Sequence, residues 1–218
     1  LANNPPSSVT LGGTVEFNGT VNQLVPGYSY NNITIAGTST KLLNGAVTIS
    51  DQLVINSGAA LSTNGKSLTL SGSGIQNNGQ FLPSSGGTVN FTGSAQSVSG
   101  SGSYSFPNLI ISSTGITTLN TSVSAAYLTI NNVSGTVLDI NGRNLTLNGP
   151  GIVVNGVLND SQGTGTVIMN TGPQNISGTN SDITFSNLRI AGTSTTLQNN
   201  ITVTGLLTVN ATRNLRLN

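Results

Sequence analysis

Very few residues of this chain could carry out acid–base or metal chemistry. Its 218 residues include no histidine and no cysteine, and the carboxylates are Glu16, Asp51, Asp139, Asp160 and Asp182. Histidine is the usual general base and a common metal ligand, and a glycoside-cleaving β-helix instead needs two carboxylates facing each other across a groove. The five carboxylates occupy unrelated positions, and Asp139 is expected to point outward between inward Leu138 and Ile140. We interpret them as solvated surface charges.

Glycine-rich stretches offer no further chemistry. They lack the aspartates of calcium-binding nonapeptides and the lysine of a phosphate-binding loop. The sequence therefore predicts a protein that is not an enzyme, with no catalytic residue, no metal site and no cofactor.

Threonine hydroxyls are the remaining candidate groups. Thr38 and Thr40 in GTSTK (37–41), and Thr193 and Thr195 in GTSTT (192–196), are spaced i and i+2. Each pair is expected to share one side of an extended segment. A flat array of such threonines could order water and bind ice or a crystalline polysaccharide. The two motifs are 155 residues apart and the copy between them reads STGIT, so support for such a face is sparse.

Composition excludes several classes of partner. Charged residues make up 5% of the chain, against about 25% in ordinary soluble domains, and the net charge is +1. No basic stripe could neutralise the phosphates of a nucleic acid, and no apolar run is long enough for membrane insertion. Apolar residues are 35% of the chain, and they alternate with Thr, Ser and Asn, which indicates folded β-structure and not disorder.

The elements that would position these residues are short strands. Segments such as SLTLS (67–71) and NLTLN (144–148) place apolar side chains on one side and threonine on the other. Leu70 is thus expected to face inward and Thr69 outward. No segment shows the 3.6-residue periodicity of a helix.

Asn-Gly dipeptides between these segments are strong turn signals. They fit antiparallel hairpins in a sandwich or propeller, or the corners of a parallel β-solenoid. We favour an all-β, right-handed parallel β-solenoid, because the strands are very short and the turns are frequent. The recurring asparagines are then either turn residues with positive φ or inward amide ladders. The recurring aromatic residues are expected in the core; they are Phe17, Tyr30, Phe91, Phe106 and Phe185.

The chain also repeats itself. NNITIAGTSTKLLN (31–44) returns at 107–120 and 186–199, so Asn32, Asn108 and Asn187 are equivalent at steps of 76 and 79 residues. The segments GTVEF (13–17), GTVNF (87–91) and GTVIM (165–169) recur at steps of 74 and 78. Such a period indicates an array in which neighbouring units cover one another.

We therefore predict a lead-in segment, residues 1–8, followed by one solenoid, residues 9–218. Its parts are a partial repeat (9–31), two full repeats (31–107 and 108–186) and a final partial repeat (187–218). Coils of roughly 20 residues, stacked about 4.8 Å apart, would give about ten coils and a rod on the order of 50 Å long. Both ends fall within a repeat and lack a polar capping coil, which suggests either a window from a longer array or a filament subunit.

Longer strings carry a resemblance to a known family. NNITIAGTSTKLLNGAVTISDQLVIN (31–56), NGKSLTLSGSGIQNNGQF (64–81) and GGTVNFTGSAQSVSG (86–100) resemble repeats of giant cell-surface adhesins of Bacteroidota, including gliding adhesins, and the exported β-helices of the filamentous-haemagglutinin type. The resemblance implies export to the cell surface and a role as an extended stalk. No functional residue carries over from it.

Three functions are consistent with these features. The first is a structural and adhesive extracellular rod that acts through many weak contacts. The second is a subunit of a self-assembling filament or sheath, and the third is ice or crystalline-polysaccharide binding. The expected partners are neighbouring repeats or copies of the same chain, with surfaces or glycans as external partners.

Overall fold

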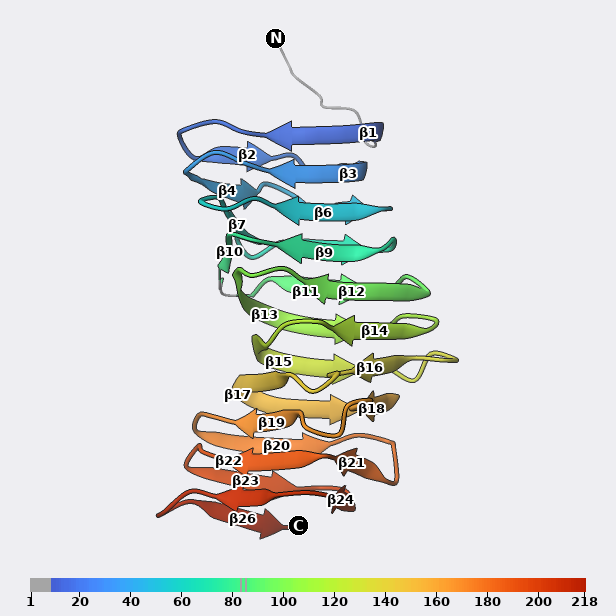
Figure 1. The fold of residues 1–218 in the computed structure, drawn as a ribbon, viewed down its shortest axis with the longest axis vertical. Helices are drawn as coiled ribbons and strands as arrows, with labels where there is room; N and C mark the ends of the chain where they lie inside the picture. The colour runs from blue at the N-terminus through green and yellow to red at the C-terminus, as the bar shows by residue number, and fades with distance from the viewer. Residues whose placement is uncertain (1–8, 83, 85) are drawn as a thin grey trace.

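The chain folds into one stack of short parallel strands (Figure 1). The computed structural model describes residues 9–82, 84 and 86–218, so the predicted lead-in segment 1–8 lies outside the described residues. The described residues form 26 strands and no helix. Paired strands are all parallel and about one coil apart in sequence, as in the register of Val89 with Leu109. The prediction of a parallel β-solenoid of about ten coils is confirmed.

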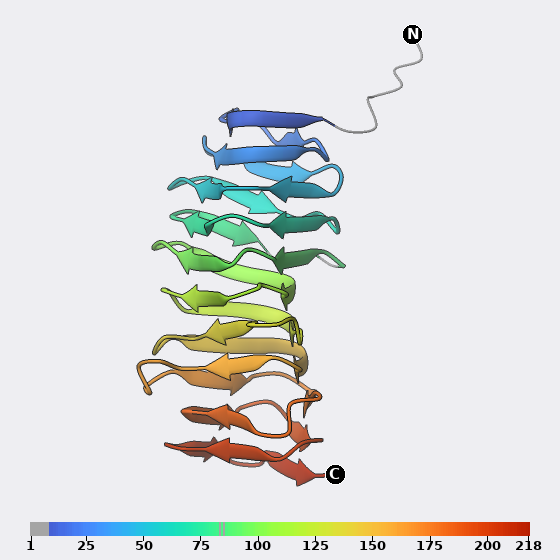
Figure 2. The same ribbon diagram turned by 90° about the vertical axis from the view of Figure 1, so that its right-hand side faces the viewer.

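Three columns of strands run along the stack, and Figure 2 shows the coils side on. The first column begins with residues Thr14–Phe17 of β1, and each strand in it pairs with or packs against the next. Its strands are β1 (Thr10–Phe17), β3 (Ser29–Ile35), β6 (Gln52–Ile55), β9 (Gly74–Asn77), β12 (Ala95–Ser99), β14 (Ile116–Leu119), β16 (Val137–Asp139), β18 (Val157–Asn159), β21 (Ile183–Phe185) and β24 (Ile201–Val203).

The second column begins with the first residues of β1 and β3, which bend around a corner. It continues through β5 (Val47–Ile49), β8 (Ser67–Leu70), β11 (Thr88–Phe91), β20 (Pro173–Ser177), β23 (Ser194–Leu197) and β26 (Asn214–Leu217).

The third column contains β2 (Gln23–Val25), β4 (Thr40–Leu43), β7 (Ala60–Ser62), β10 (Gln80–Leu82), β19 (Thr166–Met169), β22 (Asn187–Ile190) and β25 (Leu207–Val209). Three long strands turn the corner from the third column into the second, and these are β13 (Ser103–Ile111), β15 (Val123–Ile130) and β17 (Asn144–Val154).

The core lies inside the three columns and follows the alternation of the strands. Leu68 and Leu70 are buried while Thr69 between them is half-buried on the outside, as predicted. The recurring aromatic residues lie in the core, with Phe17 only partly buried. Phe106 packs against Phe81 with ring centroids 5.0 Å apart.

Corners between columns use residues with positive φ. Asn64 and Asn141 have φ values of 51° and 48°, and each precedes a glycine with positive φ. These Asn-Gly pairs therefore turn the chain at corners of a parallel stack instead of closing hairpins. Other repeated asparagines link coils: the side-chain amides of Asn108 and Asn187 donate to the carbonyl oxygens of Gly87 and Gly165 at 2.9 and 3.0 Å.

The sequence repeats do not stack on one another. The three GTVxF segments form part of β1 in the first column, β11 in the second and β19 in the third. One repeat spans three full coils and two further strands. The GTVxF segment therefore lies in a different column in each successive repeat. Equivalent residues therefore appear in turn on the three sides of the rod.

Candidate functional site

The threonines of the two GTST motifs do not form one surface. Thr38 is exposed before β4, and Thr40 is half-buried in β4, in the third column. Thr193 is exposed before β23, in the second column, whereas Thr195 is 0% exposed. The expectation that Thr193 and Thr195 share an outward side is wrong.

The cause is the length of the corner that lies before Thr40 in one copy and before Thr195 in the other. Inward Ile35 and Leu43 are eight residues apart, but inward Ile190 and Leu197 are seven apart. One residue fewer reverses the alternation, so Thr195 points into the core.

The inward position after this corner is polar in every repeat. Lys41, Thr117 and Thr195 are all fully buried there. The residue in register in the preceding coil is a glutamine each time, and the pairs are Gln23–Lys41, Gln96–Thr117 and Gln174–Thr195. The hydroxyls of Thr117 and Thr195 have no hydrogen-bond partner among the described residues.

These glutamines hold the corner that precedes them. Their side-chain oxygens accept hydrogen bonds from the main-chain N–H groups of Gly19, Gly93 and Thr171, at 2.8, 2.7 and 3.3 Å respectively. Our sequence analysis missed this role, although a glutamine follows every GTVxF segment by five or six residues. The role is structural, because each glutamine oxygen is bound to a main-chain N–H group.

Lys41 is the one buried cation among the described residues. Its Nζ donates to the carbonyl oxygen of Gly19 and to the hydroxyl of Ser39, both at 2.8 Å. Burial lowers the pKa of the Lys41 ammonium group below its usual value. The charge is thus held by uncharged oxygens of its own coil and of the coil before it.

Two carboxylates meet at one corner, contrary to our expectation of unrelated solvated charges. Asp139 is buried, and its Oδ1 accepts hydrogen bonds from the main-chain N–H groups of Asn141 and Ser161, both at 2.9 Å. Asp160, one coil further on, accepts from the N–H groups of Gly142 and Gly165 at 2.6 and 2.7 Å.

The electrostatics of Asp160 follow from these bonds. Burial alone would raise the pKa of its carboxyl group, but hydrogen bonds from Ser186 and from the main chain outweigh burial and lower that pKa. Such a group stays ionised and fastens two coils together. It is poorly suited to act as a general acid, which requires a raised pKa.

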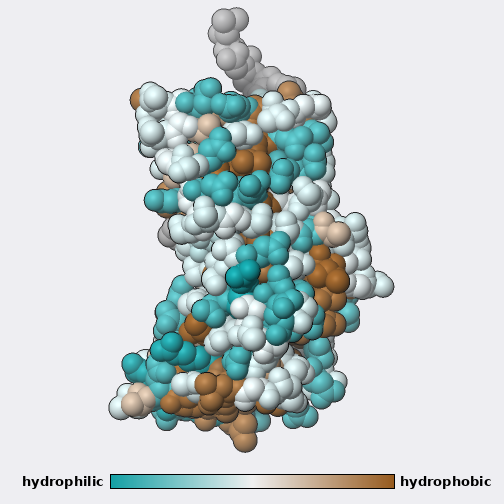
Figure 3. Space-filling view, in the orientation of Figure 1, coloured by the Kyte–Doolittle hydropathy of each residue, from teal (hydrophilic) through white to brown (hydrophobic). Residues whose placement is uncertain are grey.

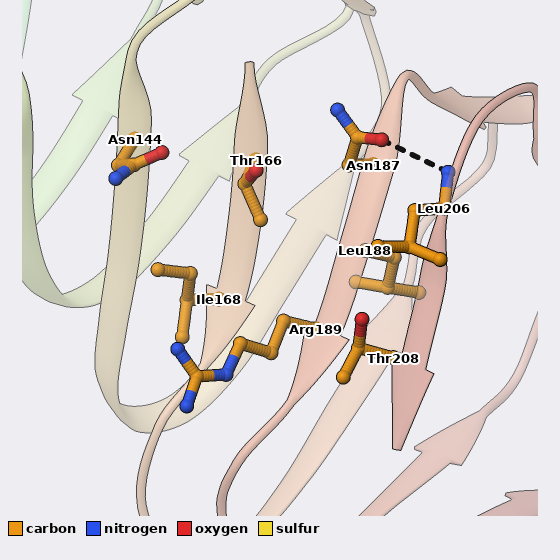
Figure 4. Close-up of a pocket in the computed structure, with 8 residues that line it drawn as sticks. All are labelled: Asn144, Thr166, Ile168, Asn187, Leu188, Arg189, Leu206 and Thr208. Atoms are coloured by element: carbon orange, nitrogen blue, oxygen red, sulfur yellow. Dashed lines mark hydrogen bonds between the residues drawn. The ribbon is translucent and has the colours of Figure 1, made fainter. Parts of the chain in front are cut away.

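A shallow groove of about 370 Å³ lies on the third column near the C-terminal end (Figure 4). One edge is the register row Asn144–Thr166–Asn187, and the other is the row Ile168–Arg189–Thr208.

Few polar groups in the groove are free. The Oδ1 of Asn187 accepts from the N–H of Leu206 at 2.9 Å, and Arg189 Nε donates to Asn210 Oδ1 at 3.4 Å. The Asn144 amide and the guanidinium group of Arg189 remain exposed. No carboxylate lines the groove, so it offers hydrogen bonds to a polar polymer and no acid–base pair.

The described residues hold no group of three or more His, Cys, Asp or Glu side chains that could bind a metal ion, and they contain no helix long and apolar enough to cross a membrane. Comparison of the chain with protein-family models, with curated proteins and with solved structures found no match.

Proposed function

We propose that the protein is a structural and adhesive extracellular rod, such as a stalk or repeat region of a cell-surface adhesin. The observation that carries the proposal is the placement of the GTVxF segments of β1, β11 and β19 on three different columns. The outward residues of these strands differ (Glu16, Asn90 and Ile168), but each side of the rod is built from the same kind of short strand, so the rod can touch its surroundings at many points. Many weak contacts add to firm attachment without a deep pocket.

The proposal also accounts for the use of polar groups. Asp139 and Asp160 accept hydrogen bonds from main-chain N–H groups, and the side chains of the glutamines bind main-chain N–H groups at corners. These groups stabilise coils and leave a surface of partly free Asn, Thr and Arg side chains. Ice binding by the GTST motifs is disfavoured, because Thr40 and Thr195 lie in different columns and Thr195 is buried.

Binding at low and high valency tests the proposal. The chain in solution should adhere weakly to glass, polystyrene and crystalline cellulose, whereas beads coated with many copies should be retained strongly. Electron microscopy of the same preparation should show rods. Saturable one-to-one binding of a soluble ligand by the free chain, or a compact particle, would contradict the proposal.

A further inference from the structure

The Asn-Gly pairs of the corners carry a chemistry of their own. They are residues 18–19, 44–45, 64–65, 78–79, 141–142, 148–149 and 155–156. The main-chain nitrogen after an asparagine can bond to Cγ of the asparagine side chain and close a five-membered imide ring, and glycine has no side chain to obstruct this approach. The side-chain nitrogen leaves as ammonia with the proton of the attacking nitrogen. Water then opens the ring and gives aspartate or isoaspartate.

A hydrogen bond donated by the glycine N–H opposes this reaction, because the bond fixes the nitrogen and must be broken before the nitrogen can attack. Four of the glycines donate such a bond to a described residue. The pairs are Gly19 N–H with Gln23 Oε1 (2.8 Å), Gly79 N–H with Asn77 Oδ1 (2.9 Å), Gly142 N–H with Asp160 Oδ1 (2.6 Å) and Gly156 N–H with the carbonyl oxygen of Ile130 (3.0 Å).

The pair Asn44–Gly45 lacks this protection. It lies at the corner between β4 and β5, and the adjacent corners, residues 25–28 and 63–66, are fully described. Among the described residues, none accepts a hydrogen bond from the Gly45 N–H, and none binds the exposed side chain of Asn44. Both reacting groups are therefore free to meet.

The other pairs show that hydrogen bonding, and not exposure, distinguishes Asn44. Hydrophilic side chains cover much of the face shown in Figure 3, and Asn18 is exposed as Asn44 is, yet the glycine after Asn18 is hydrogen-bonded. Two pairs offer no contrast. Gly149 lies within β17, and Gly65 lies beside the coil that contains residues 83 and 85, which are outside the described residues.

We propose that Asn44 is a site of spontaneous deamidation, at which the rod acquires an aspartate or an isoaspartate as it ages. The reaction consumes water, releases ammonia and needs no enzyme. Each copy that reacts gains a negative charge, in a chain that has five carboxylates. An isoaspartate also carries the main chain through its Cβ and so lengthens the corner by one carbon atom.

The corner has little room for a longer main chain. A Cβ added to Gly45 would lie 2.9 Å from Cα of Gly27, so the main chains of these two corners are in contact. On the other side, Asn64 Nδ2 donates to the carbonyl oxygen of Leu43 at 3.2 Å. Leu43 and Val47, before and after the corner, are buried. Because a packed interior transmits strain, an isoaspartate here should disturb the contacts on both sides.

Site-resolved mass spectrometry of the ageing protein tests the proposal. The folded chain is held at mildly alkaline pH, and the conversion of each asparagine is followed over time after digestion. Asn44 should convert at least about tenfold faster than the four asparagines whose following glycine is hydrogen-bonded, a difference of about 1.4 kcal/mol in activation free energy. In the denatured chain all these asparagines should convert at similar rates, because the fold no longer holds the nitrogens.

Two variants separate the cause from the consequence. Asp160→Ala frees the Gly142 N–H, so Asn141 should convert faster while Asn44 converts at its usual rate. Asn44→Gln keeps an amide but would require a six-membered ring, so it should not react at this corner. The aged unaltered chain should become sensitive to proteolysis at this corner, whereas aged Asn44→Gln should stay resistant.

The unaltered chain alone can overturn the proposal. Conversion of Asn44 no faster than that of Asn18 and the other protected asparagines would contradict the assignment of the site. Loss of protease resistance at the same rate in aged Asn44→Gln would contradict the structural consequence. Circular dichroism checks the folding of both variants, and the comparison within the unaltered chain stands even if Asp160→Ala does not fold.

Discussion

Because Leu70 faces inward and its neighbour Thr69 faces outward, substitutions at these two residues should change the free energy of unfolding by different amounts. Leu70 is fully buried in β8, between Ile49 of the coil before and Phe91 of the coil after. Leu70→Ala removes three carbon atoms at about 0.8 kcal/mol each, or about 2.4 kcal/mol. The cavity left in a packed column increases the expected loss of unfolding free energy to about 3 kcal/mol.

Thr69→Ala is the matched control. Thr69 is half-buried on the outer side, in register with Thr48 and Asn90. Losing its cross-strand contacts should cost less than about 1 kcal/mol.

Native-state proteolysis measures both variants. Its rate follows the population of the opened chain when closing is fast. Leu70→Ala should therefore be cleaved about 100-fold faster than the unaltered chain, and Thr69→Ala at most about fivefold faster. Equal acceleration by the two substitutions would refute the assignment of inward and outward sides.

Three further predictions concern buried polar groups. Because the pKa of Asp160 is lowered in the folded state, its stabilisation is present above the ordinary value of 3.8 and is lost as the pH falls toward the lowered pKa; thermal melts of Asp160→Asn should be flatter over this acid range. Burial, and secondarily Tyr28, raises the pKa of Tyr30 to about 12. The stability that Tyr30 provides below pH 10 should therefore be lost between pH 10 and about 12. The absorbance of its phenolate should appear near pH 12 and not near pH 10. Thr195→Val removes a buried hydroxyl without a partner and should raise stability by about 1 kcal/mol in denaturant melts, whereas Thr196→Val on the outer side should leave it nearly unchanged.

Local patterns predicted the strands and the Asn-Gly turns, but not the length of each corner. Alternation within SLTL sufficed to place Leu70 and Thr69, because a pleated strand sends successive side chains to opposite sides. The one-residue shortening before Thr195 reversed its direction, and a repeat alignment that favours identical letters conceals such a change. The column in which each GTVxF segment lies was not predicted either. It depends on the number of strands in each repeat and not on the residue spacing alone.

The surroundings of Asp139 and Asp160 depend on contacts between residues far apart in the sequence. Asp139 and Asp160 looked unrelated within the repeat, yet they lie 21 residues apart, which is about one coil. That spacing was the available signal for their proximity. Their main-chain partners could not be predicted, because those N–H groups become available only when Asn141 and Ser161 are held at adjacent corners.

The orientation of the strands has a mechanical consequence. All ladders described above connect one coil to the next, so their hydrogen bonds point along the long direction of the stack (Figure 1). A pull on the two ends loads these bonds in tension and opens them in sequence from an end, one ladder at a time. Each detached coil converts about 4.8 Å of folded length into about 70 Å of extended chain. The rod would yield at modest force, lengthen more than tenfold per coil and dissipate energy as it does so.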